Sequence, residues 1–430
     1  RGLGDVYKRQ IVGRAISMEA LAAVGATSGI SFLVIGCIQG LTAGFSVITA
    51  QRFGAGDYEG VKRSVATSAL LSLAATVLLT AAGILTARPL LEVMNTPADI
   101  IEDSYAYIIV IYYGVAATAF YNLLSCIIRA LGDSKTPLIF LVFASFLNVA
   151  LDLLFIITFH MGVGGAAWAT VLSQGVSGLL CLGYAWRRFP LLRMEKRHWT
   201  FDWSYAWKHL RLALPMAMQF VITGTSVLVN QAVLNLFGSA AEAAFSAASK
   251  IHMLSEQVAV SFGTAMATYA GQNYGAGKAG RVREGLRKCA LACEAITLGI
   301  MVIMTAFGGV MSSWFIDGYH PEVIQQAHLY LFISALFYPA LTMLFLYRNT
   351  LLGLGNGVTP MLAGVCELLS RMIGAPVLGH FFGFTGLCWI NPIAWVTASG
   401  LLFLSYRKTM RNIRPVDPTV DASDSNKIMN

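Results

Sequence analysis

QRFGAGDYEGVK at residues 51–62 and QNYGAGKAGRVR at residues 272–283 are two copies of one motif, and their separation decides the fold. When the chain is shifted by 221 residues, it overlays itself without a gap from residue 20 to residue 62. Two further pairs of segments match later in the chain: LGDSKTP at 131–137 with LGNGVTP at 354–360, and GVGGAAW at 162–168 with GFTGLCW at 383–389. These matches indicate two homologous halves.

Composition places both halves in a membrane. Of the 430 residues, 56% are hydrophobic and 12% are charged, against about 25% charged in a soluble domain. Apolar windows long enough to cross a bilayer, about 20 residues each, predict eleven spans. Their approximate limits are 24–50, 63–87, 104–129, 137–159, 164–187, 210–236, 244–270, 286–315, 324–350, 359–382 and 386–406. The sequence therefore predicts an all-α polytopic membrane protein.

The repeat predicts six spans in each half. An even number gives both halves the same orientation, which makes this a parallel repeat. LRLALPMAMQFVITGTSVLVNQAVLNLF at 210–237 opens the second half, and its counterpart would end near Arg14 and begin before residue 1. We therefore expect two homologous six-helix lobes, with 11 of the 12 transmembrane helices present in this sequence.

The polar decapeptide RGLGDVYKRQ at 1–10 stands where residues 222–231 stand in the second half, and it cannot be a span. One set of codons for Asp5–Gln10 spells a transposon-end adapter used to make sequencing libraries. We therefore expect residues 1–10 to be an artefactual translation of an adapter. A genuine short N-terminus is the alternative.

The net charge of +8 is interpreted as a signal of membrane topology. Beyond residue 9, Arg14, Arg88 and Lys250 lie in loops on one side, and Arg371 lies within a span. The other Lys and Arg residues, Arg348 included, are assigned to the opposite side. Positively charged loops stay in the cytoplasm, so we expect a cytoplasmic C-terminus, a bacterial inner-membrane location and no nucleic-acid partner. The expected domains are an N-terminal lobe at 11–190 (spans 2–6), a cytoplasmic basic linker at 191–209, a C-terminal lobe at 210–408 (spans 7–12) and a cytoplasmic tail at 409–430.

Six motifs carry a resemblance to a known family: VGRAISMEALAAVGATS, AQRFGAGDYEGVKRSVA, AGQNYGAGKAGRVREG, RALGDSKTP, NVALDLLF and RNTLLGLGNGVTP. In this order, and with the repeat, residues 11–410 resemble the multidrug and toxic compound extrusion (MATE) family. The resemblance implies two lobes around a central cavity, and export of organic, mostly cationic compounds in exchange for H⁺ or Na⁺ by alternating access. The implied partners are small organic cations and the lipid bilayer. No cofactor is implied beyond the coupling ion, and we expect a monomer.

Charged residues inside spans are candidate site residues, because a charge at mid-bilayer costs about 2.5–3.5 kcal/mol. They are Asp152, Glu256, Glu294, Glu367 and Arg371. Of these, Glu294 is expected at the membrane interface.

Asp152 and Asn148 are four residues apart and share one helical face, and Thr170 lies in the next span. Their oxygen atoms would suit sodium; alternatively, a buried carboxyl group can carry a proton. The resemblance adds that some family members bind the coupling cation with an Asn-x-x-x-Asp pair, a Thr on the next helix and an Asp on the first helix. Asn148, Asp152 and Thr170 match that spacing. A buried structural hydrogen-bond pair is the alternative.

Glu367 and Arg371, also four residues apart, predict a structural ion pair or, alternatively, a direct part in coupling. Glu256 corresponds to Ile35 in the first half, so it breaks the repeat. It is a candidate counter-ion for a substrate cation or a second proton site, unless His252 simply hydrogen-bonds it.

Aromatic and amide side chains within spans are further candidates, because aromatic faces attract organic cations. They are Tyr112, Tyr113, Phe120, Tyr121, Asn122, Gln219, Asn230 and Gln231. Each could equally face lipid or the core. The GAG sequences at 54–56 and 275–277 do not follow a strand and lack the Gly-Lys-Ser/Thr of a phosphate-binding loop. They are expected to end one helix and begin the next.

The alternative function is a flippase for lipid-linked oligosaccharide, of the related superfamily. Such carriers tend to have extra spans and cations in the cavity, whereas only Arg371 is assigned to the membrane interior here. Enzyme activity is not expected. The seven His residues are dispersed without HExxH-type spacing, and no nucleophile, base or metal set is clustered.

Overall fold

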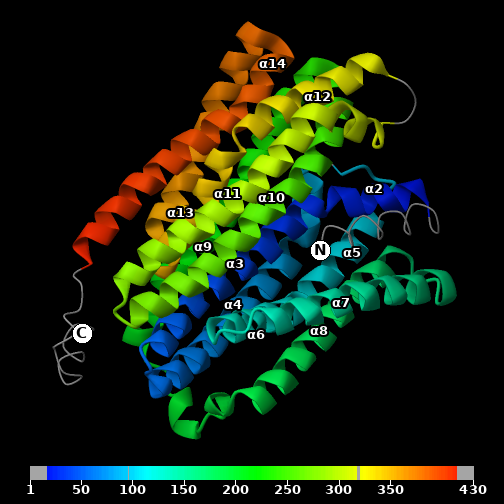
Figure 1. The fold of residues 1–430 in the computed structure, drawn as a ribbon. Coiled ribbons are helices and arrows are strands. Elements are labelled where there is room, and N and C mark those ends of the chain that lie inside the picture. Colours follow the sequence, from blue (N-terminus) through cyan, green and yellow to red (C-terminus); the bar gives the residue numbers. More distant parts are fainter. Residues whose placement is uncertain (1–16, 95, 317–319, 414–430) are drawn as a thin grey trace. The chain divides into compact units, whose positions relative to one another are not determined.

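The computed structural model describes residues 17–94, 96–316 and 320–413, which are helical apart from short connections (Figure 1). The prediction about residues 1–10 lies outside these ranges. Within them, 7 helices are long and apolar enough to cross a membrane, or up to 9 if each of two bent helix pairs is one span. The prediction of an all-α polytopic membrane protein is confirmed.

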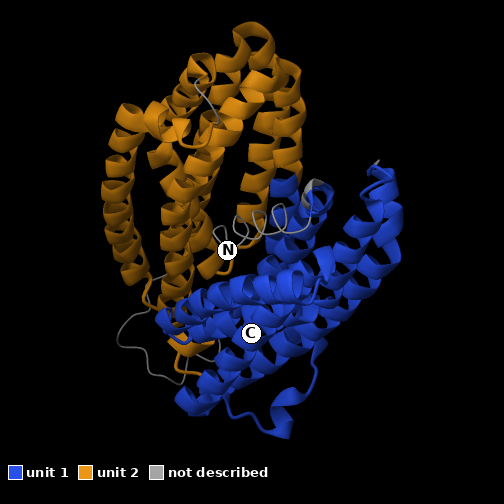
Figure 2. Ribbon diagram, turned by 90° about the vertical axis from the view of Figure 1, so that its right-hand side faces the viewer, with its two compact units in different colours: residues 1–50, 58–224 blue, residues 51–57, 225–430 orange. Residues whose placement is uncertain are grey.

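The chain divides into two compact units, coloured separately in Figure 2. Unit 1 comprises residues 1–50 and 58–224. Its elements are α2 (Met18–Ala26), most of α3 (Ser28–Gly54), α4 (Tyr58–Val93), α5 (Ile101–Tyr113), α6 (Val115–Ala130), α7 (Lys135–Leu153), the π-helical turn η1 (Leu154–Thr158), α8 (Gly162–Arg188), the 3-10 turns η2 (Pro190–Leu192) and η3 (Lys196–Trp199), and α9 (Trp203–Leu234) as far as residue 224.

Unit 2 comprises residues 51–57 and 225–430. Its elements are the end of α9, the 3-10 turn η4 (Asn235–Phe237), α10 (Gly238–Gly275), α11 (Ala279–Ser313), α12 (Pro321–Leu336), α13 (Tyr338–Gly353) and α14 (Val358–Asn412). Each unit has its own apolar core. The core of unit 1 includes Tyr112 with residues of α4, α5 and α8, and the core of unit 2 includes Tyr330 with residues of α10, α13 and α14.

Every predicted span lies in described helices. Two spans share the continuous stretch 203–275, and the last two share α14, which breaks at Gly383 with φ 59° and ψ −143°. The pair α5–α6 bends by 43° at Gly114, and the pair α12–α13 bends by 52° at Phe337. These bends lie 223 residues apart, as LGDSKTP and LGNGVTP do. The repeat is therefore visible in the helix geometry.

Each GAG sequence ends a helix, as predicted. Gly56 follows α3 with φ 72°, and Gly277 follows α10 with φ 69°, a conformation that glycine adopts without a steric penalty. The residue after each glycine donates its backbone N–H to a carbonyl five residues earlier, at 3.0 Å in the first loop and 2.8 Å in the second. This pattern is the Schellman motif, which satisfies the last carbonyl groups of a helix.

Residues 51–57 pack inside unit 2, against the end of α10. A Cβ atom on Gly54 would overlap the carbonyl oxygen of Gln272, and a Cβ atom on Gly275 would overlap the carbonyl oxygen of Gln51. These positions are related by the 221-residue offset, so the contact is reciprocal. The Gln51 side chain also donates to the carbonyl oxygen of Gly353 at 2.8 Å.

Candidate functional site

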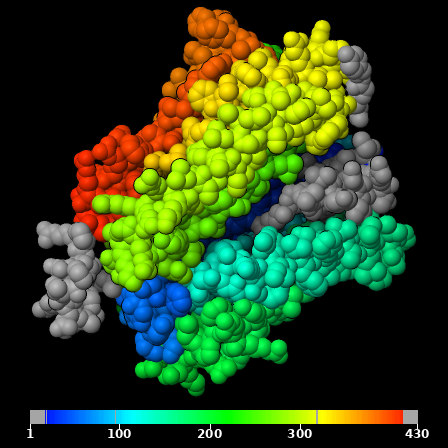
Figure 3. Space-filling view, viewed as in Figure 1, coloured from blue at the N-terminus to red at the C-terminus, as the bar shows by residue number. Residues whose placement is uncertain are grey.

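The helix α7 has an apolar exposed side and a small buried side. Figure 3 shows α7, in teal, at the surface of the molecule, and its Phe146 side chain is 74% exposed. The buried residues of α7 are Pro137, Ala144 and Asp152, and Asp152 has no exposed surface. The carboxyl group of Asp152 therefore lies inside unit 1 and does not face lipid.

The structure brings together two of the three predicted N-terminal site residues by a direct contact. Asn148 of α7 and Thr170 of α8 are both half-buried, and the Asn148 amide donates to the Thr170 hydroxyl at 3.4 Å. The Thr170 hydroxyl in turn donates to the carbonyl of Ala166 at 3.1 Å. Asp152 lies one helical turn beyond Asn148 on the same helix. Their role as ion ligands stays a prediction.

Immediately beyond Leu153, α7 passes into the π-helical turn η1. The N–H of Phe159 donates to the carbonyl of Leu154 at 3.1 Å, the five-residue step of a π-helix. After it, His160 adopts a left-handed conformation with φ 51°, uncommon for a residue other than glycine. Such turns occur frequently at functional sites. Sequence spacing gave no signal for η1, because any apolar helix can contain one.

A buried polar stripe on α8 extends the site and was missed in the sequence. Ser173, Gln174 and Ser177 follow Thr170 at helical spacing, and all three are buried. Ser173 donates to the Thr170 carbonyl at 2.9 Å, and Ser177 donates to the Phe140 carbonyl of α7 at 3.3 Å. The signal was present in TVLSQGVS, where polar residues recur at positions i, i+3, i+4 and i+7 of an apolar helix.

Unit 2 contains a cluster of charged side chains centred on Glu367. One Glu367 carboxylate oxygen forms an ion pair with Arg348 of α13, and the other lies 3.5 Å from Arg371. The side chains are 13%, 10% and 12% exposed, respectively. The two residues predicted to pair are thus in contact, but Glu367 also bridges to a second helix.

The assignment of Arg348 to a loop, which left Arg371 as the only cation in the membrane interior, is wrong. Arg348 lies within α13, and the residue is 8% exposed. The expected span 324–350 already contained Arg348, but the residue was counted with the loop cations, because its partner carboxylate stands on a different helix, 19 residues later in the chain.

Arg371 extends the cluster to α12. Its Nε donates to the Asn391 side-chain oxygen at 3.2 Å, and the Asn391 amide donates to the Tyr330 hydroxyl at 3.0 Å. Neither Asn391 nor Tyr330 was among the sequence candidates. A polar chain therefore joins α13, both segments of α14 and α12 inside unit 2.

Glu256 of α10 belongs to the same electrostatic group. It is half-buried, and it interacts electrostatically with Glu367, Arg371 and Arg348. With both carboxylates ionised the four side chains are neutral together, and a proton on Glu256 leaves one net positive charge. The net charge of the group therefore depends on whether Glu256 carries a proton.

His252 pairs with a different residue from the one considered in the sequence. Its Nδ1 lies 2.9 Å from the Tyr338 hydroxyl, and its ring stacks on Trp395 at 5.3 Å between centroids. The Tyr338 hydroxyl also lies 3.3 Å from the Met304 sulfur, so His252 is held by a contact between α10 and α13 and not by Glu256.

The aromatic and amide candidates of unit 1 lie in three environments. Tyr112 and Tyr121 are buried, and the Tyr121 hydroxyl donates to the Pro137 carbonyl at 3.2 Å. Asn122 is half-buried and donates within its own helix. Two more candidates are the half-buried Phe120 and the exposed Tyr113.

The remaining candidates lie on α9 and α11. Gln219 is half-buried, and Gln231 donates to the Asn235 side chain at 2.8 Å. The side-chain oxygen of Asn230 is buried and accepts no hydrogen bond from the described part of the chain. Glu294 is half-buried in α11. Asn230 therefore has a buried acceptor atom without a hydrogen-bond partner in the described part of the chain.

Comparison with known proteins gives consistent matches over most of the chain. A model of the MatE family matches residues 9–154 and 215–377. The chain is 30% identical over 398 residues to the probable multidrug resistance protein YpnP of Bacillus subtilis, covering 91% of this chain and 86% of that protein. It is 26% identical over 416 residues to the probable multidrug resistance protein YoeA of Bacillus subtilis, covering 94% and 89%. A crystal structure of MATE in the bent conformation has a TM-score of 0.89 at 23% identity, covering 96% of this chain and 92% of that one, and this likeness shows the fold.

Proposed function

The chain belongs to the MatE family, and we propose that it is a secondary active antiporter that exports organic, mostly cationic compounds in exchange for H⁺ or Na⁺ by alternating access. The family match extends over both halves of the repeat, so the resemblance seen in the sequence is confirmed. The protein is therefore a multi-pass membrane transporter of the multidrug efflux class and not an enzyme. The coupling ion and the substrate class are the parts that we infer.

The observation that carries the proposal is the fully buried carboxyl group of Asp152, next to the contact between Asn148 and Thr170. A carboxylate inside an apolar helix bundle is costly unless hydrogen bonds, a cation or a proton compensate its charge, and the last two are the ions that an antiporter exchanges. Carboxylate, amide and hydroxyl oxygens together are hard ligands for a sodium ion, and the carboxyl group alone suffices for a proton. This part of unit 1 is our proposed coupling site.

Coupling requires that the ion bind one conformation more tightly than the other. An ion with equal affinity for the inward-facing and outward-facing states shifts neither population. In the proposed site, Asn148 of α7 donates to Thr170 of α8 at 3.4 Å, and the π-helical turn follows directly after α7. A bound cation would draw the oxygen atoms of both helices together and favour the state in which they are closest.

Unit 2 supplies the second part of the proposal. Glu256 is a half-buried carboxylate that takes no part in the Glu367 ion pairs, so it can act as counter-ion to an organic cation. A proton on the same carboxylate would remove that counter-ion. Competition between proton and substrate for one carboxylate is a direct way to exchange them. Glu367 is then held by Arg348 and Arg371 as a fixed charge.

The test is ethidium efflux from proteoliposomes driven by an imposed H⁺ or Na⁺ gradient. Asp152→Asn keeps the shape of the side chain but removes its charge, and we expect it to abolish gradient-driven efflux while the protein remains folded. Asp103→Asn is the matched control, because Asp103 is an exposed carboxylate of the same unit. Gradient-driven efflux at the wild-type rate in the Asp152→Asn variant would refute the coupling site.

A flippase for lipid-linked oligosaccharide remains a second candidate, because the structure buries two cations where the sequence assigned one. Two guanidinium groups could contact a pyrophosphate, although both already contact Glu367. The same vesicles separate the functions. Export of ethidium down an ion gradient supports the antiporter, whereas translocation of a fluorescent polyprenyl pyrophosphate without a gradient supports the flippase.

We place the protein in the inner membrane of a bacterium with its C-terminus in the cytoplasm, acting as a monomer. The basic loops support this orientation through the positive-inside rule. Alkaline phosphatase fused after residue 413 should be inactive in cells, and fused at the turn η4 (Asn235–Phe237) between α9 and α10 it should be active. Activity of the C-terminal fusion would reverse the assigned topology.

A further inference from the structure

The first turns of α9 have two chemically different faces. Tyr205, Ala206, His209 and Leu212 are buried, and they recur at helical spacing against unit 1. The opposite face exposes Trp203 at 62% and Trp207 at 52%. When one stripe of a helix is buried, the residues of the opposite face stay exposed. The exposed residues of α9 therefore form one continuous surface.

Two cations share the exposed face with the tryptophans. Lys208 and Arg211 are exposed, and neither has a hydrogen-bond or ion-pair partner within the described ranges. One turn farther along, the same face becomes aliphatic, with Leu214 and Met218 exposed. The surface thus changes from aromatic and cationic to apolar over about 10 Å, since each helical residue rises about 1.5 Å.

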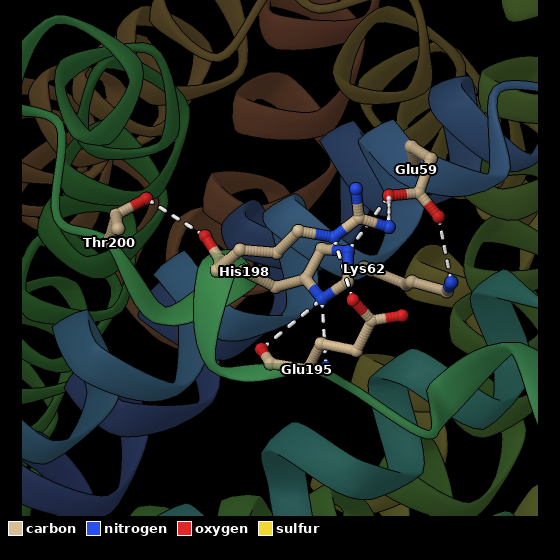
Figure 4. Close-up of polar contacts among 6 residues, drawn as sticks. Glu59, Lys62, Glu195, His198 and Thr200 are labelled. Atoms are coloured by element: carbon tan, nitrogen blue, oxygen red, sulfur yellow. Dashed lines mark hydrogen bonds and ion pairs between the residues drawn. The ribbon is translucent and has the colours of Figure 1, made fainter.

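The preceding linker is fixed to α4 by its polar side chains. Glu59 accepts hydrogen bonds from His198 at 2.8 Å and from Lys62 at 2.7 Å (Figure 4). It also lies 3.3 Å from the Arg197 guanidinium. The buried His198 ring also accepts from the backbone N–H of Glu195 at 2.9 Å. These contacts hold the linker on unit 1.

The start of α9 is held in the same way. Asp202 accepts from the backbone N–H of Ser204 at 2.9 Å, which caps the helix, and it forms an ion pair with Arg63 at 2.6 Å. The Arg63 guanidinium lies 4.5 Å from the centre of the Tyr205 ring. The polar groups on the inner side are therefore engaged with α4, and the orientation of the outer face is fixed.

We propose that the exposed face of residues 203–218 binds one anionic phospholipid of the cytoplasmic leaflet. Lys208 and Arg211 contact the headgroup phosphate, the Trp203 and Trp207 rings lie among the headgroups, and Leu214 and Met218 contact the acyl chains. The inference rests on the proposed orientation of the chain in the membrane, but not on the transport reaction.

A phospholipid fits this surface better than a soluble anion or a protein. It presents a phosphate directly beside hydrocarbon, in the same order in which α9 presents its cations and aliphatic side chains. Tryptophan is enriched at the boundary between headgroups and hydrocarbon, and each basic side chain near an anionic leaflet adds about 1 kcal/mol, roughly a fivefold preference.

The test is lipid retention by the full chain in native mass spectrometry, with equimolar phosphatidylglycerol and phosphatidylcholine. We expect wild-type protein to retain one phosphatidylglycerol in preference, and Lys208→Gln/Arg211→Gln to lower that preference by at least about fivefold. Lys278→Gln/Arg287→Gln is the matched control, because it removes two exposed cations elsewhere and should leave the preference unchanged. Lys208→Arg/Arg211→Lys keeps both charges and should retain the lipid if loss of charge, not misfolding, explains the first variant.

Three results would overturn the proposal. They are equal retention of both lipids by the wild type, the same loss of preference in the control pair, and displacement of the lipid by millimolar inorganic phosphate. Trp207→Leu gives an independent check, because removal of the indole should weaken retention of both lipids without changing their ratio. Ethidium efflux, measured separately, reports on the proposed function and does not enter this test.

Discussion

Arg348 and Glu367 form a buried ion pair that joins α13 to α14, although 19 residues separate them in the chain. Arg371 lies on the other side of the same carboxylate. One carboxylate therefore forms ion pairs with two guanidinium groups inside unit 2. Removing the carboxylate leaves two buried cations facing each other, whereas removing Arg348 leaves Glu367 paired with Arg371.

Glu367→Gln should therefore destabilise the protein more than Arg348→Met. An unpaired buried charge costs about 3–5 kcal/mol, and only the first variant creates two of them. Thermal unfolding in detergent, followed by intrinsic fluorescence, measures the order. Equal melting temperatures for the two variants would contradict the predicted order, and melting temperatures equal to that of the wild type would show that the ion pairs do not stabilise unit 2.

Thr170→Val removes the hydroxyl group to which Asn148 donates. If Thr170 helps to bind the coupling ion, the half-saturating ion concentration for efflux should rise about tenfold, as expected for the loss of one hydrogen bond or ligand contact to a charged group. Thr170→Ser retains the hydroxyl and is the control, with an expected change below about threefold. A purely structural role would lower the amount of folded protein in Thr170→Val and leave the half-saturating concentration unchanged.

Gly275→Ala should disrupt the end of α10, because the added methyl group would overlap the carbonyl oxygen of Gln51. Forced overlap at a packed backbone contact costs about 1–3 kcal/mol. Gly280→Ala, two residues into α11, is the matched control, since a Cβ atom there meets nothing within 4 Å. We expect a lower melting temperature only for Gly275→Ala. An unchanged melting temperature in that variant would contradict the close contact with Gln51.

The linker contact with Glu59 should depend on acid pH. Hydrogen bonds from Lys62 and His198 lower the pKa of Glu59 from 4.5 to about 2. Because the pKa is lowered, the contact contributes its full share to stability above pH 4.5. This contribution to stability is lost as the pH falls from 4.5 toward 2.

Limited proteolysis by pepsin can follow this change. Cleavage between residues 189 and 202 should increase across that pH range in the wild type. In Glu59→Gln the linker should already be cleaved readily at pH 4.5, with a smaller further rise below it. Parallel pH profiles for the two proteins would show that Glu59 does not hold the linker.

Hydropathy and the repeat were sufficient to predict the helical fold, because both leave a signal in the linear sequence. The two GAG sequences also predicted helix ends correctly, since a glycine with positive φ is the usual device there. The proximity of Asn148 to Thr170 could be predicted because α7 and α8 are consecutive helices.

Features that depend on distant packing could not be predicted. The burial of Arg348 depends on a carboxylate of the next helix, so a count of cations at the ends of predicted spans assigns the residue to a loop although the span 324–350 contains it. The π-helical turn after Asp152 depends on one extra residue in a hydrogen-bonded ring, for which LLFIIT gives no pattern. The partner of His252 is Tyr338, 86 residues away, and not the nearby Glu256.

The reciprocal contact of the two GAG loops makes the residue allowed in one copy of the motif depend on the other copy. Duplicated segments are generally free to diverge, because each folds on its own surroundings. Here the backbone of each loop packs directly against the glycine of the other, as equivalent residues do in a self-complementary dimer interface. A side chain at Gly54 would overlap the backbone of the second copy, and a side chain at Gly275 would overlap the backbone of the first. Each copy therefore restricts substitution of the glycine in the other.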